Sequence, residues 1–328
     1  MRYVFGPVTS HRLGLSLGLD LVPRKTCNFN CIYCELGPTR RRTARRAPYV
    51  AAAEIARELE AFLHREGAPR PDVLTLCGSG EPTLNSELGA IIASAKGFGL
   101  PVALLTNGSL FVDAAVRAEA LGADIILPSC DAADDATLAR VNRPLPGLSA
   151  AAYVRGLVEL RREFRGRVLL EVMLVAGVND SAGHLERLAR ACREISPERV
   201  QLTTVLRPPA LAAARPVSAA VMAAAREVFE RLSGCPVDVP QEWAGSSSAE
   251  AGEHGTELED ELLALLSRRP ATAADAAAAL GAAGVEVSAL LERLYQAGSV
   301  ERREHRGQPF YVRGPASKAR RGVKGQLT

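Results

Sequence analysis

Short apolar runs alternate with amphipathic segments from about residue 13 to residue 240. Six of the runs have the length and content of buried strands, and they lie at 13–21, 72–77, 101–106, 124–129, 167–175 and 199–205. The segments between them carry apolar residues at helical spacing. At 54–66 these are Ile55, Leu59, Phe62 and Leu63, and residues 181–195 repeat the pattern. The chain is therefore predicted to alternate strands with helices.

Strands that alternate with helices form right-handed βαβ units around a parallel sheet. Six such units are too few for a closed eight-stranded barrel. The predicted fold class is α/β, with a partial (βα)6 TIM-like barrel over residues 1–240. Function in parallel βα folds lies at the carboxyl ends of the strands, so the loops after each strand are where a site is expected.

The C-terminal quarter has a different pattern. Residues 241–256 are polar and rich in Ser, Gly and Ala, which is typical of a linker. Residues 257–314 then contain three helical segments and two short strands about a turn at Gly307. This order predicts a small winged-helix domain. The basic residues 315–328 are predicted to form a disordered tail.

Charge and composition exclude few functions. The chain is 47% hydrophobic and 23% charged, as in an ordinary globular enzyme, and its net charge of +3 does not make the whole molecule a polyanion binder. Basic residues gather at 39–46 and 318–324. No apolar run reaches membrane-spanning length, and the N-terminus lacks the apolar core of a signal peptide. We expect a cytoplasmic protein with no membrane partner.

Three of the seven cysteines lie in the loop after the first predicted strand, with the spacing C-x3-C-x2-C: Cys27, Cys31 and Cys34. In a reducing compartment such a cluster more often holds metal than disulfides. Three thiolates are one short of a closed zinc site, and no second C-x-x-C or histidine pair supplies the fourth ligand. The group suits a [4Fe–4S] cluster with one open position, while zinc binding or packing is the plainer alternative.

The loops after the next three strands are rich in small and hydrogen-bonding residues, namely CGSGEPTLN at 77–85, LLTNGSL at 104–110 and LPSCDA at 127–132. Together with the cysteine loop, they resemble the radical S-adenosylmethionine (SAM) superfamily. The resemblance implies that the cysteines hold the cluster and that SAM is the missing ligand through its amino and carboxylate groups. It also implies reductive SAM cleavage and hydrogen abstraction from a substrate by a 5′-deoxyadenosyl radical.

The resemblance also implies SAM contacts at the strand ends. Tyr33 matches the aromatic residue before the last cysteine. The loop that receives the methionine amino group is matched by Gly78, Gly80, Glu81 and Pro82, with Ser79 in place of a second glycine. Thr106 and Asn107 would lie near the methionyl carboxylate.

Two further strand ends complete this assignment. Ser129 and Asp131 stand on alternate positions and hence on one face, which makes them candidates for the ribose hydroxyls. Met173 and Val175 would face the adenine.

The order of the motifs resembles the branch related to the wybutosine-synthesising tRNA-modifying enzymes, over residues 1–240. The motifs in order are CNFNCIYCELG, GSGEPTLN, PSCDA, VNRPLPGLS, MLVAGVND and VQLTTVLRPPA. Those enzymes carry a further N-terminal cysteine set, whereas none of the 26 residues before Cys27 is a cysteine, and they lack a C-terminal winged helix. The branch chemistry is therefore implied, but pyruvate condensation onto a tRNA guanine is not.

The remaining candidates have plainer interpretations beside the functional ones. Cys77, Cys130, Cys192 and Cys235 are interpreted as small buried hydrophobes, with Cys77 kept as an auxiliary ligand candidate. The arginines of 40–46 form either a solvated loop or a surface for a phosphate-bearing substrate or an acidic electron donor of the flavodoxin or ferredoxin type. Arg143 and Arg207 line the substrate mouth or serve loop packing.

The predicted function is that of a radical SAM enzyme, and the branch resemblance and basic loop lean toward RNA, especially tRNA, as substrate. A peptide or protein substrate is the competing enzyme hypothesis, and a non-catalytic Fe–S winged-helix regulator is the alternative of another class. Glu286 and Glu292 on the third C-terminal helix repel DNA phosphates, so specific DNA binding is not expected. The basic hairpin at 302–306 suits RNA or an acidic peptide.

Overall fold

The computed structural model describes residues 1–10, 12–66, 69–239 and 256–314. The chain divides into two compact units, Met1–Ala244 and Gly245–Thr328, and each is described by itself. The predicted tail at 315–328 lies outside the described residues, as does the predicted linker at 241–256 except for Thr256, where a helix begins.

The N-terminal unit is built on one eight-stranded sheet with the order β1-β2-β5-β6-β7-β8-β9-β10. The strands are β1 (Val4–Ser10), β2 (Gly14–Asp20), β5 (Val73–Cys77), β6 (Val102–Thr106), β7 (Ile125–Pro128), β8 (Arg167–Leu174), β9 (Arg199–Thr204) and β10 (Val237–Asp238). β1 pairs antiparallel with β2, and all other neighbours are parallel. The six predicted strands are confirmed, whereas the edge strands β1 and β10 were missed.

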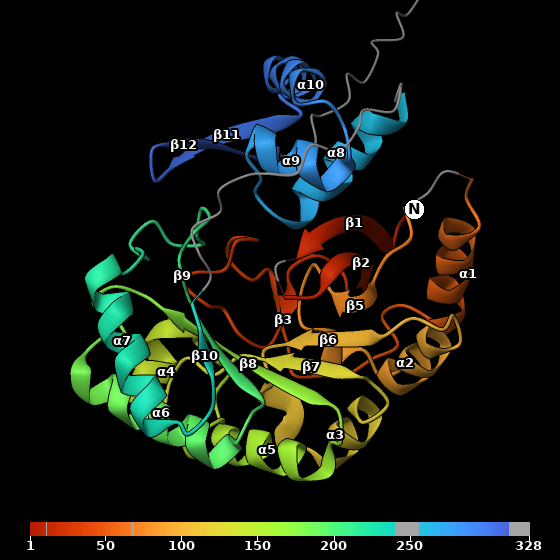
Figure 1. Ribbon diagram of the computed structural model, residues 1–328. Coiled ribbons are helices and arrows are strands. Elements are labelled where there is room, and N and C mark those ends of the chain that lie inside the picture. The colour runs from red at the N-terminus through yellow and green to blue at the C-terminus, as the bar shows by residue number, and fades with distance from the viewer. Residues whose placement is uncertain (11, 67–68, 240–255, 315–328) are drawn as a thin grey trace, which may run out of the picture. The chain divides into compact units, whose positions relative to one another are not determined.

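Helices cover the outer face of this sheet, as Figure 1 shows. They are α1 (Ala52–Leu63), α2 (Leu88–Lys96), α3 (Ala114–Ala120), α4 (Asp135–Val141), α5 (Ala150–Glu163), α6 (Ala182–Ile195) and α7 (Ala219–Leu232), with short 3-10 turns η1 (Pro82–Leu84) and η2 (Ser109–Val112). The main core lies between these helices and the sheet and includes Leu59, Leu76, Leu104 and Leu188, all fully buried. The fold is thus α/β with a parallel sheet, as in a partial barrel.

The inner face of the sheet has a smaller apolar cluster and a polar strip. Val73, Ala103, Ile125, Leu127 and Leu169 form the cluster. The Ser16 and Thr75 hydroxyls lie 2.6 Å apart, and the Arg12 guanidinium donates to Glu171 and to Gln201, the latter at 3.1 Å. The concave side is therefore less apolar than the helix-covered side.

Two very short strands stand apart from the main sheet. β3 (Thr26–Cys27) pairs in parallel with β4 (Arg41–Arg42), so that Cys27 faces Arg42 in register. This pairing brings the basic run at 40–46 directly beside the first cysteine of the triplet.

The C-terminal unit contains three helices followed by an antiparallel hairpin: α8 (Thr256–Arg268), α9 (Ala273–Leu280), α10 (Gly284–Gln296), β11 (Val300–His305) and β12 (Gln308–Arg313). Thr272 and Asp275 form a capping box at the start of α9. The buried side chains of Leu262, Leu266, Val287 and Leu291 form its centre.

Within the described ranges, no single helix is long and apolar enough to cross a membrane. The bent pair of α9 and α10 meets the criterion by combined length and composition alone. Both of these helices carry fully or nearly fully buried residues of the C-terminal unit.

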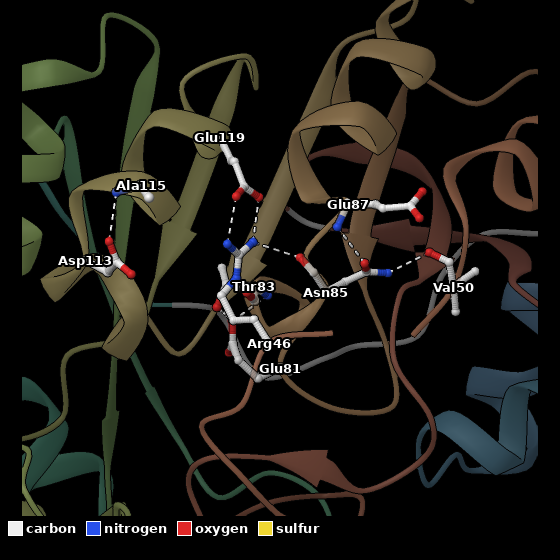
Figure 2. A network of polar contacts seen from close by, with 9 residues as sticks. All are labelled: Arg46, Val50, Glu81, Thr83, Asn85, Glu87, Asp113, Ala115 and Glu119. Atoms are coloured by element: carbon white, nitrogen blue, oxygen red, sulfur yellow. Dashed lines mark hydrogen bonds and ion pairs between the residues drawn. The ribbon is translucent and has the colours of Figure 1, made fainter. Parts of the chain in front are cut away.

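Arg46 ties the loop after β5 to α3 (Figure 2). Its guanidinium makes a bidentate ion pair with Glu119 at 2.7 and 2.5 Å and donates to the carbonyl oxygens of Thr83 and Asn85, both at 2.9 Å. Asn85 is fully buried and all its amide atoms are used, by the carbonyls of Leu21 and Val50 and by the Glu87 N–H. This arginine of the basic run therefore has a structural role.

The free energy of unfolding of the Arg46→Ala variant is expected to be about 2–3 kcal/mol lower than that of the wild type, because two buried carbonyls and a carboxylate lose a charged donor together. Urea denaturation of the variant measures the difference. Arg45→Ala is the control, because Arg45 is the exposed neighbour in the same run. An equal loss of stability in Arg46→Ala and Arg45→Ala would contradict the structural role of Arg46.

Candidate active site

The three cysteines of the triplet differ in burial from Cys130 and Cys192. Cys27, Cys31 and Cys34 are all partly exposed, whereas Cys130 and Cys192 are fully buried in the main core. The buried-hydrophobe interpretation of Cys130 and Cys192 is thereby confirmed. Cys77, at the end of β5, and Cys235 are partly exposed.

Each sulfur of the triplet accepts a hydrogen bond from a different side-chain nitrogen. Asn107 Nδ2 lies 3.6 Å from Cys27 Sγ, and Asn142 Nδ2 lies 3.5 Å from Cys31 Sγ. Lys25 Nζ lies 3.6 Å from Cys34 Sγ and also donates to the Gly37 carbonyl. Donors of this kind stabilise thiolates and are one of the features by which proteins set the potential of an iron–sulfur cluster.

Lys25 is held in an uncommon state for a lysine. Its side chain is 4% exposed, and its backbone has a φ of +64°, which L-residues rarely adopt. Its N–H donates to the Ser79 carbonyl at 2.6 Å. Burial lowers the pKa of its ammonium group, while the thiols of Cys34 and Cys27 raise it. Sequence reasoning missed Lys25, since a lysine next to a cysteine motif is an ordinary surface residue by pattern.

The thiols of Cys27 and Cys31 lie where ionisation is unfavourable without a cation. Burial raises the pKa of Cys27 to about 12, and the Glu81 carboxylate adds to the rise. Burial also raises the pKa of Cys31, with further contributions from the other two cysteines and Asp131. Such thiols become thiolates when they bind a metal, whose charge offsets the burial.

The donor set fits a cluster better than a single ion. In the described part of the chain, no three His, Cys, Asp or Glu side chains form a group that could hold one metal ion. A [4Fe–4S] cluster binds each thiolate to a different iron, so its ligands need not meet at one point. A zinc site needs four ligands around one point, and this site does not offer them.

Glu81 joins the loops after β5 and β6. Its Oε1 accepts from the Thr83 N–H at 3.1 Å, from the Thr83 hydroxyl at 2.5 Å and from the Thr106 hydroxyl at 2.6 Å, while Oε2 accepts from the Asn107 N–H at 2.7 Å. The residue is 2% exposed, and burial raises its pKa although these hydrogen bonds lower it. A carboxylate oxygen can accept two hydrogen bonds, so Oε2 has capacity for one more.

The glycines of this loop allow a close approach to the cysteine loop. A Cβ at Gly80 would lie 2.0 Å from the Thr26 carbonyl oxygen, the atom that accepts from the Glu81 N–H at 3.0 Å. Gly78 has a φ of +117°. Ser79 is explained by Asp20, whose carboxylate accepts from the Ser79 N–H at 3.0 Å and from its hydroxyl. Pro82 begins η1 and is buried.

Asp131 does not share an open face with Ser129. Ser129 is partly exposed, whereas Asp131 is fully buried: its Oδ2 accepts from the Tyr33 hydroxyl and from Asn142 Nδ2 at 2.6 Å, and its Oδ1 accepts from the Met173 N–H at 2.8 Å. Asp131 therefore connects the cysteine loop with β8.

The two residues predicted to face the adenine, Met173 and Val175, also differ in exposure. Met173 is partly exposed on the inner face of β8. Val175 is fully buried in the main core, and its N–H donates to Asn179 Oδ1 at 2.7 Å. Only Met173 lies where a ligand on the concave side could touch it.

The two arginines considered for the substrate mouth are placed differently. Arg207 lies against the cysteine loop and pairs with Glu35 at 3.2 Å. Arg143 is exposed, and its carbonyl accepts from Arg42 at 2.7 Å and from the Asn30 N–H at 3.2 Å. The Arg42 guanidinium also donates to the Pro144 carbonyl, so it holds the loop after α4 against β4.

Burial raises the pKa of Asp131 from 3.8 to about 6, although Tyr33, Met173 and Asn142 donate to it. The folded state therefore binds this proton more tightly than the unfolded state, and the stability gained is present below about pH 4 and is lost as the pH rises through about 6. Between pH 4.5 and 7.5 the cluster-free wild type should lose about 2 kcal/mol that the Asp131→Asn variant keeps. Chemical denaturation at both pH values measures this, and parallel losses in the two proteins would refute it.

The comparisons with known proteins agree with this geometry. The family model of the radical SAM superfamily matches residues 21–191, which include the cysteine loop and the strand ends through β8. The chain therefore belongs to the radical SAM superfamily, whose enzymes use a [4Fe–4S] cluster and SAM. Proteins of similar sequence place the chain in a smaller group within the superfamily.

A UPF0026 protein of Helicobacter pylori strain J99 is 37% identical over 276 residues, which cover 83% of this chain and 86% of that protein. Within the superfamily, the chain thus falls among the UPF0026 proteins. A protein of Brachyspira hyodysenteriae named GTPase Obg is 36% identical over 299 residues; these are 90% of this chain, which spans only 43% of that relative.

Among solved structures, a radical SAM methyltransferase from Sphaerobacter thermophilus superposes with a TM-score of 0.52 at 22% identity. The match covers 69% of this chain and 66% of that one. At this identity the likeness concerns the fold alone. It agrees with the parallel α/β sheet of the N-terminal unit.

Proposed function

We propose that this radical SAM enzyme binds its [4Fe–4S] cluster through Cys27, Cys31 and Cys34 and modifies RNA, with tRNA the favoured class. When bound, the cluster supplies the electron that cleaves SAM, and the 5′-deoxyadenosyl radical so formed abstracts hydrogen from the substrate. The observation that carries the proposal is the meeting of the cysteine loop with the Glu81 loop, where the Glu81 N–H donates to the Thr26 carbonyl at 3.0 Å.

The chain's own residues would bind and orient the two cofactors. Asn107, Asn142 and Lys25 donate to the three sulfurs, and these donors support the cysteines as cluster ligands. Glu81 Oε2 would accept from the methionine amino group, in line with the resemblance of its loop. The Thr106 hydroxyl and the Asn107 N–H hold the Glu81 carboxylate in place through hydrogen bonds of 2.6 and 2.7 Å.

Two residues would extend the SAM site beyond the Glu81 loop, and three more would support it. Ser129 is proposed for a ribose hydroxyl and Met173 for the adenine, since both are partly exposed. Asp131 and Val175 are buried, so we propose that they shape the site from behind and make no direct contact. Tyr33, whose hydroxyl donates to Asp131, would fix the position of the last two cysteines.

We propose that residues 1–240 form the radical SAM barrel and residues 257–314 a winged helix. The three helices followed by the β11–β12 hairpin support the second assignment. Arg302, Arg303 and Arg306 are exposed on that hairpin and suit an RNA backbone, whereas Glu286 and Glu292 on α10 disfavour DNA readout. The placement beside the wybutosine-synthesising enzymes rests on the order of the sequence motifs.

The first experiment follows 5′-deoxyadenosine. The protein is loaded anaerobically with iron and sulfide, reduced with dithionite and given SAM, with and without bulk tRNA. Release of 5′-deoxyadenosine that rises with tRNA is expected. Release that rises only with a peptide pool would instead favour a peptide substrate. No release from fully loaded protein, together with salt-dependent nucleic-acid binding, would favour the non-catalytic regulator.

Radical SAM enzymes need an electron donor, and we propose an acidic flavodoxin or ferredoxin for this one. Arg40, Arg41 and Arg45 are exposed beside the Cys27 strand, where positive charge would steer such a donor. Reversing all three charges should lower flavodoxin-driven SAM cleavage about tenfold or more at low salt, with dithionite-driven cleavage unchanged. A loss confined to tRNA-dependent cleavage under dithionite would instead assign these arginines to the substrate.

A further inference from the structure

Asn142 has a buried amide oxygen with no hydrogen-bond partner. The residue is the C-cap of α4 and is 1% exposed, and its Oδ1 lacks a donor. In the described residues the same holds for the hydroxyl of Thr26, the residue before Cys27. A buried acceptor of this kind is costly, and natural proteins keep one mainly where a ligand or water supplies the donor.

The direction of that oxygen is fixed by the other half of the amide. Asn142 Nδ2 faces three acceptors: Asp131 Oδ2 at 2.6 Å, the Tyr33 hydroxyl at 3.3 Å and Cys31 Sγ at 3.5 Å. The opposite orientation would set the amide oxygen against the Asp131 carboxylate and the sulfur, where no donor compensates the repulsion. The nitrogen therefore faces the cysteine loop, and the oxygen faces away from Asp131.

The backbone holds Asn142 and the cysteine loop together. The Asn30 N–H donates to the Asn142 carbonyl at 3.0 Å, and the Ile32 N–H donates to the Val141 carbonyl at 3.0 Å. These bonds flank Cys31 on both sides, so the end of α4 is fixed relative to the proposed cluster ligand.

We propose that Asn142 is a further SAM-binding residue, whose Oδ1 accepts a hydrogen bond from a donor group of SAM while its Nδ2 holds Cys31 Sγ. The inference rests on the proposed cluster and SAM site. SAM carries its donors on the amino group, the ribose and the adenine, and it must lie against the cluster that Cys31 would bind. One amide would thus link the cosubstrate to a cluster ligand.

The test measures SAM affinity without turnover. Wild type, Asn142→Ala and Asn142→Ser are loaded anaerobically, kept oxidised, and dialysed to equilibrium against labelled SAM. For Asn142→Ala we expect wild-type iron and sulfide content and a Kd for SAM raised about tenfold, the usual effect of one lost buried hydrogen bond. Asn142→Ser, which keeps a shorter acceptor, should show a smaller increase.

Ser233→Ala is the control, because Ser233 is 3% exposed and lies between α7 and β10, where its hydroxyl has partners in the Cys235 carbonyl and N–H. It should lose stability and keep its SAM affinity once loaded. An unchanged Kd in Asn142→Ala would overturn the inference, as would failure of both Asn142 variants to load a cluster, which would give the amide a role in the cysteine loop alone. A wild type that loads no cluster or binds no SAM would instead refute the proposed function.

Discussion

The Cys31→Ala variant is expected to lose SAM cleavage completely, with 5′-deoxyadenosine at the background of cluster-free protein. Cys31 is the middle ligand of the proposed three, its sulfur accepts from Asn142, and its loop is fixed to the end of α4 by two backbone hydrogen bonds. Two thiolates hold a cubane poorly, so both the cluster and the site for SAM are lost. Iron and sulfide analysis and product chromatography measure the two losses.

Cys235→Ala is the control for this substitution. Cys235 is partly exposed like Cys31, but it lies between α7 and β10, where its sulfur contacts the Ser233 hydroxyl at 3.3 Å. The control should load a cluster and cleave SAM as the wild type does. Full cluster content and cleavage in Cys31→Ala would mean that the ligand assignment is wrong.

The strands that sequence reasoning found share one physical property. β5, β6 and β7 are short, mostly buried apolar runs, because helices cover one face and the barrel interior the other. β1, with the sequence VFGPVTS, has no such run: it is an antiparallel edge strand that contains Gly and Pro and an irregular register between Phe5 and Val8. β10 has only two residues and is fixed by its pairing with β9.

Asp131 and Val175, which sequence reasoning assigned to the SAM face, are buried for one shared reason. The alternation of faces was extended to Asp131 and Val175, but β7 ends at Pro128 and β8 ends at Leu174. Beyond the last residue of a strand the period of two no longer holds, and both side chains turn into the protein. Met173 lies within β8 and keeps the predicted side.

Some residues belong to the site only through tertiary contacts, and the sequence around them does not indicate that role. Lys25 and Asn142 are separated by more than a hundred positions, yet each donates to a sulfur of the same triplet. Asn28 also acts through tertiary contacts: its Oδ1 accepts from Asn107 Nδ2, and its Nδ2 donates to the Ser109 hydroxyl. The cysteine spacing, by contrast, is a local property of one loop, and for this reason it could be read from the sequence.

Gly80→Ala is expected to be as damaging as loss of a cysteine, although it adds one methyl group. The new Cβ would lie 2.0 Å from the Thr26 carbonyl oxygen and 2.9 Å from both the Thr26 carbonyl carbon and Val22 Cγ2. The first two are backbone atoms, so they cannot move aside alone. The Glu81 loop must move away from the strand that carries Cys27, which breaks the Glu81–Thr26 hydrogen bond and the Lys25–Ser79 hydrogen bond together.

We expect the free energy of unfolding of Gly80→Ala to be at least about 3 kcal/mol lower than that of the wild type, because backbone atoms that clash with a new methyl group cannot move without disrupting their neighbours. We also expect the variant to bind SAM too weakly to measure. Gly183→Ala is the control: Gly183 lies in α6, where the nearest atom to an added Cβ is the flexible Arg187 guanidinium at 3.5 Å. A helical alanine there should raise stability by up to about 1 kcal/mol. Thermal denaturation and SAM dialysis of both variants separate the two cases. Wild-type behaviour in Gly80→Ala would mean that the two loops do not pack as closely as described, and the proposed joint site for cluster and SAM would fail with it.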